Sequence, residues 1–139
     1  MKKKEQITVK TIVHSNIEIV WNTWTEPEHI KKWNTASKDW HTTKAENNFT
    51  KGGRFTSRME AKDGSMGFDF GGIYTKIVPK QHIAYTLDDD RRVTIDFKGQ
   101  GDTIAITETF EAENENPIAM QRDGWQAILD NFKKYTEAL

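Results

Sequence analysis

The sequence contains no cysteine and only three prolines among its 139 residues. Disulfide bonds and thiolate chemistry are therefore excluded, and the absence of cysteine fits a reducing compartment. An excess of basic charge is also missing, because the formal net charge is −1 and Lys and Arg are spread along the chain. A surface dedicated to nucleic acid shows a basic stripe, so this charge pattern argues against nucleic-acid binding.

Long apolar runs are absent as well. No stretch approaches the roughly 20 apolar residues that a membrane-spanning helix needs. The start of the chain is basic, but it lacks the apolar segment of a signal peptide. We therefore expect a soluble, cytoplasmic protein that does not contact membranes.

Aromatic residues, in contrast, are plentiful: the chain has five Trp, seven Phe and three Tyr. Large rings bury much area per residue, so they build a core from few, bulky pieces. A chain of this length is typical of one domain. We therefore expect a single domain that spans residues 1–139.

The first third of the chain predicts a strand and two short helices. Residues 7–13 are rich in β-branched side chains, as strands are. Ser15 and Glu18 have the spacing of a capping box, in which each side chain satisfies a free amide at a helix start. Thr25 and Glu28 repeat this pattern. The first helix has an apolar face, and the second has Pro27 in its first turn with Ile30 and Trp33 as apolar contacts.

The middle of the chain predicts a β-hairpin. Two runs of strand-like residues flank the turn Asp63-Gly64, a dipeptide that accepts the positive φ of a tight turn. In the second arm, residues 68, 70 and 74 share one face, whereas Ile73 and Ile77 share the other. Both sets cannot face one core along a regular strand. We therefore expect a bulge or bend at Gly71-Gly72.

Three further alternating runs, at residues 83–87, 93–97 and 104–110, are separated by short turns and predict an antiparallel meander. A long helix follows, with Asn116 as its cap and Pro117 in its first position, and it runs to about Leu139. Such a helix is roughly 35 Å long. The order predicts an α+β fold in which a curved sheet surrounds the helix and leaves a cavity.

Gly124 lies inside the predicted helix, where glycine costs about 1 kcal/mol relative to alanine. We expect either a close approach to another backbone or a slight kink at this position.

Several of these segments together resemble the activator-of-heat-shock-protein-90-ATPase-like proteins of the START-like, or helix-grip, superfamily. The resemblance covers nearly the whole chain and is specific through the order and spacing of its segments. They are Val20-Trp21, residues 25–33, Gly52-Gly53-Arg54-Phe55, Asp63-Gly64, Gly72-Ile73-Tyr74, Ile77-Val78-Pro79, residues 83–86, residues 93–97, and Gly124-Trp125 with Leu129.

The resemblance implies a helix-grip fold, with a curved antiparallel sheet of about seven strands around a long C-terminal helix and two short helices after the first strand. It also implies a pocket between the sheet and that helix. Relatives in the superfamily bind lipids, steroids, polyketides or plant aromatics, and some are cyclases or hydrolases. The eukaryotic activator has a separate N-terminal domain that this chain is too short to hold, so a co-chaperone role does not follow from the fold.

Residues on the predicted inner faces are the candidates for lining this pocket. An aromatic on an apolar face is more often plain core, so packing alone is the alternative interpretation for each. The candidates are Trp33, Trp40, Phe55, Met59, Phe68, Phe70, Tyr85, Glu108, Trp125, Ile128 and Phe132.

Glu108 is the one charged residue that shares a strand face with Ile104, Ile106 and Phe110. A buried carboxylate costs several kcal/mol unless it is paired or neutralised. Glu108 therefore lies at the pocket mouth, has a partner such as an inward Arg, or is turned out to water by strand twist.

Three functions remain open from the residues and the resemblance. The first is a binding protein for a small hydrophobic or aromatic molecule. The second is a helix-grip enzyme, cyclase- or hydrolase-like, which would combine Glu108 with a Tyr or His. The third is a chaperone-associated protein-interaction module, for which the sequence gives no direct support. No Ser–His–acid motif is visible, which favours binding over catalysis, although triad members can be distant in sequence.

No metal or other cofactor is expected. The four histidines have no metal-ligand spacing, and Asp88-Asp89-Asp90 lacks the Gly and the distant Glu of a calcium loop. We therefore predict that EDTA leaves the melting temperature unchanged, as measured by thermal unfolding. A drop that one divalent ion restores would reveal a metal site.

Overall fold

The computed structural model describes residues 4–139 and contains seven strands and three helices. The strands are β1 (Gln6–Val13), β2 (Trp40–Asn47), β3 (Arg54–Ala61), β4 (Gly67–Val78), β5 (His82–Leu87), β6 (Arg92–Gln100) and β7 (Thr103–Glu111). The helices are α1 (Ile17–Thr25), α2 (Pro27–Trp33) and α3 (Ile118–Glu137).

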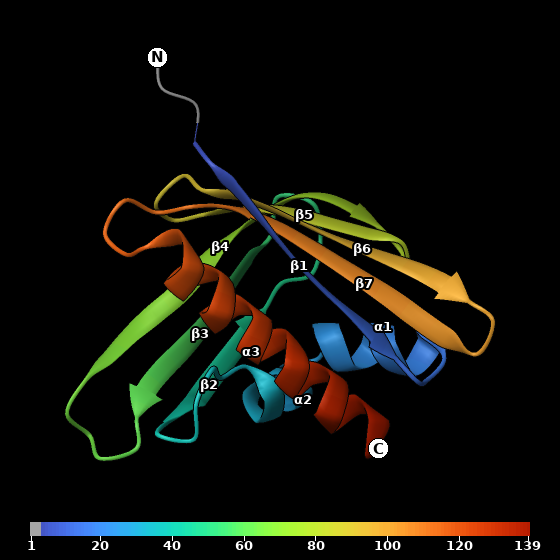
Figure 1. Ribbon diagram of the computed structural model, residues 1–139, viewed down its shortest axis with the longest axis horizontal. Coiled ribbons are helices and arrows are strands. Elements are labelled where there is room, and N and C mark those ends of the chain that lie inside the picture. The colour runs from blue at the N-terminus through green and yellow to red at the C-terminus, as the bar shows by residue number, and fades with distance from the viewer. Residues whose placement is uncertain (1–3) are drawn as a thin grey trace.

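All seven strands form one antiparallel sheet in the order β1-β7-β6-β5-β4-β3-β2 (Figure 1). Consecutive strands from β2 to β7 pair with their neighbours, and β1 closes onto β7. The sheet is curled into a half-barrel around α3, which confirms the predicted α+β helix-grip fold. Among the helices of residues 4–139, none has the length and apolar character that a membrane crossing requires.

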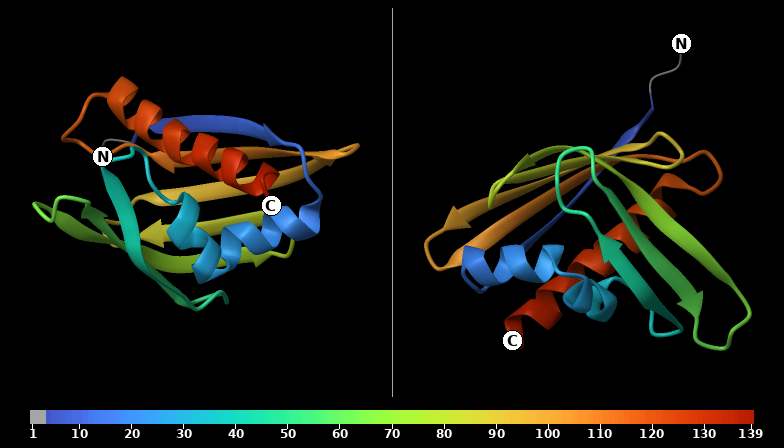
Figure 2. Two further views of the ribbon diagram at one scale, coloured as in Figure 1. Left: turned by 90° about the horizontal axis from the view of Figure 1, so that it is seen from below. Right: turned by 180° about the vertical axis from the view of Figure 1, so that it is seen from behind.

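The long helix α3 lies along the concave side of the sheet, and α1 and α2 pack near its C-terminal end (Figure 2). Phe132 of α3 packs against both Trp24 of α1 and Trp33 of α2, with ring centroids 4.8 and 5.0 Å away. One turn further, His29 Nδ1 lies 2.8 Å from the Tyr135 hydroxyl. The C-terminal half of α3 is therefore closed off by the two short helices, whereas its N-terminal half faces the sheet.

The core forms from the inner faces of the strands and one side of α3. Inner and outer residues alternate along β5, β6 and β7, as a half-buried sheet requires. The largest fully buried side chains are Phe110, Phe132, Ile7, Ile83, Ile95, Ile106, Leu129, Val9, Val13, Val20 and Val93.

Neither predicted capping box forms. The cap of α1 is Asn16 rather than Ser15, and its Oδ1 accepts a hydrogen bond from the Ile19 amide at 2.9 Å. The cap of α2 is Glu26, without a side-chain cap bond. Thr25 instead ends α1 and donates its hydroxyl to the Trp21 carbonyl. The spacing of residues in the sequence identified the two helices but not the residue that caps each of them.

The start of α3 also differs from the prediction. Pro117, rather than Asn116, is the cap residue, and the helix begins at Ile118 and ends at Glu137. Its 20 residues give a length of about 30 Å. Asn116 has another role, because its carbonyl accepts a hydrogen bond from the Gln121 side chain at 2.8 Å.

The change of face in β4 occurs after Tyr74 rather than at Gly71-Gly72, where it was predicted. Gly71 and Gly72 keep regular pairing with β3, and the register with β5 shifts between Tyr74 and Lys76. A bulge inserts one residue and so inverts the alternation beyond it. Tyr74 is therefore buried, Ile73 is exposed, and Ile77 packs against the core.

The two glycines have a different role, which is close approach to neighbouring strands. A Cβ on Gly72 would lie 2.4 Å from the Thr86 carbonyl oxygen of β5. Any side chain at this position therefore forces the two backbones apart. The sequence correctly predicted an irregular backbone in β4, but the bulge lies a few residues beyond the glycine pair.

We predict that Gly72→Ala lowers the free energy of unfolding by about 1–3 kcal/mol, the usual effect of overpacking. Urea denaturation measures this change. Gly99→Ala is the matched control, because a Cβ on Gly99 of β6 meets nothing within 4 Å. Equal effects of the two substitutions would contradict the close-approach explanation.

Candidate functional site

A cavity of about 450 Å³ lies between the curved sheet and the N-terminal half of α3. Phe132 fills the space beside α1 and α2, whereas the side chains in the N-terminal half of α3, Trp125 included, leave space toward β3 and β4. The lining residues come from nearly every element of the fold. They are Trp24, Ile30, Trp33, Asn34, Ala36, Glu46, Phe55, Ser57, Met59, Phe68, Phe70, Tyr74, Tyr85, Arg91, Glu108, Glu113, Asn116, Met120, Gln121, Gly124, Trp125, Ile128 and Leu129.

Aromatic rings form the wall on the strand side. Phe55 of β3 contacts Tyr85 of β5 at 4.8 Å and Tyr74 of β4 at 5.2 Å, measured between ring centroids. Phe70 lies beyond them, 6.2 Å from Phe55. These rings hold one another in edge-on or tilted arrangements, which aromatic pairs prefer. The wall is thus apolar and firmly packed.

The helix side of the cavity is fixed by Trp125. Its ring stacks on Phe110 of β7, with centroids 3.8 Å apart and planes 9° from parallel. Trp125 also contacts Phe70 across the cavity at 6.1 Å. This side chain therefore attaches α3 to the sheet and forms a wall of the cavity at the same time.

Gly124 adjoins Trp125 and also lines the cavity, but no backbone approaches it. A Cβ at Gly124 would meet nothing within 4 Å. The expected close approach is therefore wrong. The missing side chain instead leaves space in the cavity.

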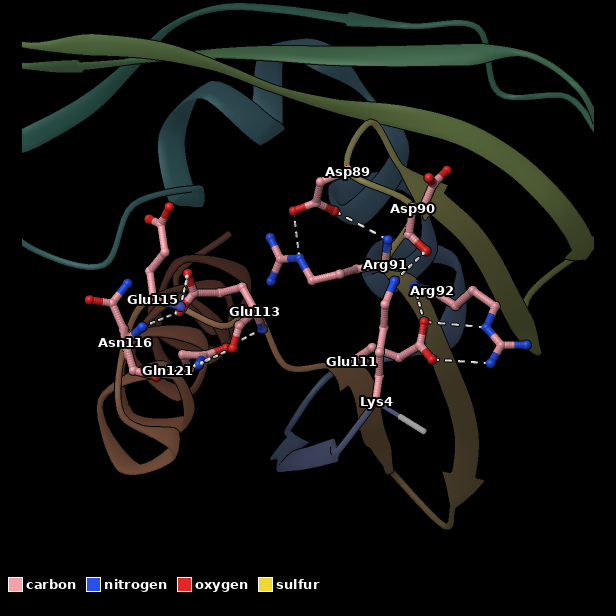
Figure 3. Close-up of polar contacts among 10 residues, drawn as sticks. All are labelled: Lys4, Asp89, Asp90, Arg91, Arg92, Glu111, Glu113, Glu115, Asn116 and Gln121. Atoms are coloured by element: carbon pink, nitrogen blue, oxygen red, sulfur yellow. Dashed lines mark hydrogen bonds and ion pairs between the residues drawn. The ribbon is translucent and has the colours of Figure 1, made fainter. Parts of the chain in front are cut away.

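The rim of the cavity at the start of α3 is polar. Gln121 is buried; its Oε1 accepts a hydrogen bond from the Glu113 amide at 2.9 Å, and its Nε2 donates to the Asn116 carbonyl (Figure 3). Met120 and Phe68 also line the cavity, and both are largely exposed. The exposed lining residues show that the cavity opens to solvent between α3 and the β3–β4 hairpin.

Arg91 contributes a cation from the turn between β5 and β6. Its Nε donates to Asp89 Oδ2 at 2.7 Å (Figure 3). The next residue, Arg92, points elsewhere and forms an ion pair with Glu111 at 3.0 Å. The turn that contains Asp88-Asp89-Asp90 therefore places the guanidinium of Arg91 on the cavity wall.

Glu108 of β7 lies deep in the cavity, with only 6 % of its surface exposed. Its neighbours across the sheet are Val9 of β1 and Ile95 of β6. Within residues 4–139, the structure shows no hydrogen bond or ion pair to its carboxyl group. Burial without compensation raises the pKa of Glu108 to about 8. The structure thus fits none of the three possibilities stated from the sequence: Glu108 faces the cavity, but it lies deep rather than at the mouth, has no partner among the described residues and is not turned out to water.

Tyr85 lies on the same face of the sheet. Its pKa is raised well above the ordinary value, first by burial and second by the nearby Glu108 carboxylate. Tyr74 is also kept neutral by burial, and its hydroxyl donates to Asn47 Oδ1 at 2.7 Å. Both phenols are therefore hydrogen-bonding groups rather than charges at neutral pH.

Nine of the predicted pocket residues line the cavity: Trp33, Phe55, Met59, Phe68, Phe70, Tyr85, Glu108, Trp125 and Ile128. Two predicted residues do not. Phe132 is fully buried against Trp24 and Trp33 below the cavity. Trp40 packs outside the cavity, with its ring 5.8 Å from Phe68. Both were chosen for aromaticity and position in the chain, which do not reveal how far a neighbouring helix closes the space.

Sequence reasoning missed the other lining residues, among them Trp24, Tyr74 and Arg91. Trp24 lies on the apolar face predicted for the first helix, Tyr74 was left ambiguous by the alternation in β4, and Arg91 was not among the candidates. The helical spacing of Trp24 was a usable signal. The position of Arg91 had no signal, because turn geometry decides where its side chain points.

A metal centre is not apparent in the part of the chain that the structure describes. No group of three or more His, Asp or Glu side chains there is placed to hold an ion.

Comparison with known proteins shows a match over residues 14–137 to the family described as Activator of Hsp90 ATPase homolog 1-like protein. The chain belongs to this family. No curated protein matches it. The family therefore fixes the fold without naming a ligand.

Two solved structures are similar over nearly their whole length. An AHSA1-like protein from Aeromonas hydrophila is 42% identical with a TM-score of 0.91, covering 96% of this chain and 93% of that one. The protein Chr148 from Cytophaga hutchinsonii is 50% identical with a TM-score of 0.84, covering 96% and 92%. The Aha1 dimer from Colwellia psychrerythraea, 15% identical with a TM-score of 0.73 and 96% coverage of both chains, shares the fold alone.

We predict that Glu108→Gln stabilises the protein by roughly 1–3 kcal/mol at pH 7. The folded state holds the Glu108 proton more tightly than the unfolded state, since its pKa is raised to about 8. Wild-type stability is therefore full below the unfolded pKa and falls as pH climbs toward the folded pKa. Urea unfolding between about pH 4 and 8 should show this decline, and the Gln variant should lose most of it.

Glu28→Gln is the control for this experiment, because Glu28 is an exposed carboxylate on α2. It should change stability by less than about 0.5 kcal/mol at every pH, as surface substitutions do. A Glu108→Gln variant that is less stable than wild type at pH 7 would show that the carboxylate has a stabilising partner.

Proposed function

We propose that this protein binds a small hydrophobic or aromatic molecule in the cavity between the sheet and α3. The observation that carries the proposal is an open cavity of about 450 Å³ with a largely apolar and aromatic wall. Ligand sites in proteins span roughly 300–1,000 Å³ and combine apolar walls with a few polar groups. Glu108, Tyr85 and Arg91 are such polar groups.

The fold supports the same proposal. Proteins with the START-like fold commonly bind ligands, and this chain has that fold. An unfilled aromatic cavity is consistent with a ligand function, because protein interiors pack to the density of organic crystals and voids are costly. Gly124 is consistent with a binding role, since it weakens α3 without any packing requirement and enlarges the cavity.

A second candidate is a helix-grip enzyme that uses acid–base chemistry. The observation that favours it is the proximity of Glu108 and Tyr85 within one apolar cavity. A carboxyl group with a pKa of about 8 suits proton transfer at neutral pH, and a neutral phenol suits hydrogen-bond donation to a substrate oxygen. Turnover of a bound compound, detected by mass spectrometry, would decide for this candidate.

Binding should quench tryptophan fluorescence, because Trp24, Trp33 and Trp125 line the cavity. We predict a saturable response to at least one member of a panel of fatty acids, sterols and flavonoid-like compounds. The bound position is checked by chemical-shift changes at cavity residues in NMR spectra. A panel without any saturable response would contradict the proposal.

Gly124→Leu tests whether the response comes from the cavity. The added side chain points into open space that belongs to the cavity, so it should weaken binding at least tenfold while α3 remains folded. Gly124→Ala should retain binding and raise the free energy of unfolding by about 1 kcal/mol. Asp123→Leu places the same side chain on the exposed face of α3 and serves as the matched control. Equal affinity of wild type and Gly124→Leu would place the ligand elsewhere.

A further inference from the structure

The Glu108 carboxyl group lacks a partner and remains open to the cavity. Within residues 4–139, it forms no hydrogen bond or ion pair, although the residue is only 6 % exposed. Among the described residues, the side-chain polar atom that is inaccessible to solvent and also lacks a hydrogen bond is Thr136 Oγ1. The Glu108 oxygens lack a hydrogen bond too, so they must keep some accessible surface. That surface faces the cavity that Glu108 lines. A ligand in the cavity can reach them.

The groups around Glu108 do not supply a compensating cation. Across the sheet Glu108 faces Val9 of β1 and Ile95 of β6. On the cavity wall, β4 and β5 contribute the phenols of Tyr74 and Tyr85, and α3 contributes apolar side chains together with the uncharged amide of Gln121. Burial alone accounts for the raised pKa of Glu108, so no nearby positive charge opposes it.

The ionisable groups elsewhere on the cavity wall already have partners. Glu46 pairs with Lys44 at 2.8 Å, and the Glu113 carboxylate accepts a hydrogen bond from the Asn116 amide at 2.8 Å. Arg91 is the cation of the lining within residues 4–139, and it pairs with Asp89 at 2.7 Å. Among the ionisable groups of the lining, the Glu108 carboxyl group is therefore the one for which the described residues supply no partner.

The aromatic wall favours a positive charge. The rings of Phe55, Phe70 and Trp125 line the apolar part of the cavity. A cation over the face of such a ring is attracted by its quadrupole, and the attraction grows when water is excluded. A carboxylate and aromatic rings together stabilise an ammonium group more than either does alone.

We propose that the molecule bound in this cavity is an amine with an aromatic or other apolar body, and that its ammonium group pairs with the carboxylate of Glu108. The apolar body then packs against the aromatic wall. This inference rests on the proposed binding function and specifies the chemical class of its ligand.

The proposal predicts a direction for the pH dependence of binding. In the empty protein the carboxyl group is mostly protonated at pH 6, because its pKa is about 8. An ammonium ion pairs with the ionised form, so binding releases the Glu108 proton to solvent. Affinity for an amine should therefore rise up to about tenfold per pH unit between pH 6 and 8 and level off above. A neutral ligand that accepts a hydrogen bond from the protonated carboxyl shows the reverse trend.

Three probes of one shape test the charge: 2-(2-naphthyl)ethylamine, 2-(2-naphthyl)ethanol and 3-(2-naphthyl)propanoate. Isothermal titration calorimetry at pH 8 should show at least tenfold tighter binding of the amine than of the alcohol or the carboxylate. Titrations in buffers of different ionisation enthalpy at pH 6.5 should show release of nearly one proton with the amine. Equal affinity for amine and alcohol, tightest binding of the carboxylate, or no proton release would overturn the proposal.

The Glu108→Gln variant tests whether the preference for the amine and the proton release depend on this residue. The variant should bind the amine at least tenfold more weakly at pH 8, bind the alcohol with unchanged affinity and release no proton. Glu28→Gln, on the exposed face of α2, should behave as wild type. An amine affinity that Glu108→Gln leaves unchanged would overturn the proposal. The pH and proton-release measurements on wild type do not depend on whether the variant folds.

The results distinguish a wrong ligand class from a wrong binding function. If the alcohol and the amine bind equally in the cavity, the ligand class is wrong and the binding function stands. If none of the three probes, nor any member of the broader panel, binds to the wild-type protein, both are wrong.

Discussion

The attachment of α3 to the rest of the fold at two unequal places controls this structure. Near its end, Phe132 packs against Trp24 of α1 and Trp33 of α2. Near its start, Trp125 stacks on Phe110 and holds the helix to β7. Because β3 and β4 curve away on the other side, the same helix that completes the core also covers a cavity. The core and the candidate site are thus two consequences of one packing arrangement.

The alternation of side chains along β7 places an ionisable group in the cavity. Every second residue from Ile104 to Phe110 points inward, and the pleat of the strand leaves Glu108 no other direction. Its neighbours are apolar, so the carboxyl group loses hydration without gaining a partner. Burial of an ionisable group at a cost to stability is common at functional sites, where the environment is arranged to shift a pKa. The cavity of this protein matches this pattern, because burial raises the pKa of Glu108.

Binding and catalysis remain related possibilities on this scaffold. A fold does not determine a function, which depends on the groups that a site presents. Here the site presents one buried carboxyl group, a neutral phenol, a guanidinium already paired with Asp89, and a wall of rings. An unpaired carboxyl group among aromatic side chains is best complemented by a positive charge. The proposed class of ligand therefore rests more on the polar groups of the cavity than on its volume.

The sequence determined the elements and their faces, because hydrophobic spacing is a local property. The alternation of β5 to β7 and the hairpin at Asp63-Gly64 were predicted correctly, and Trp125, Ile128 and Phe132 do lie on the inner face of α3. Helix starts were less certain, since neighbouring polar residues such as Ser15 and Asn16 compete to cap. The bulge in β4 was misplaced because a glycine pair signals either a bulge or a close approach, and only the pairing with β5 distinguishes them.

Only the tertiary structure decided what surrounds each inward side chain. The sequence placed both Trp125 and Phe132 on the inner face of α3, but the docking of α1 and α2 fills the space beside one and not the other. The sequence marked Glu108 as inward, but its lack of a partner depends on residues from four other strands and a helix. The turn after β5 directs Arg91 into the cavity and Arg92 out to Glu111. Local spacing fixes the direction of a side chain, whereas its surroundings depend on contacts between distant segments.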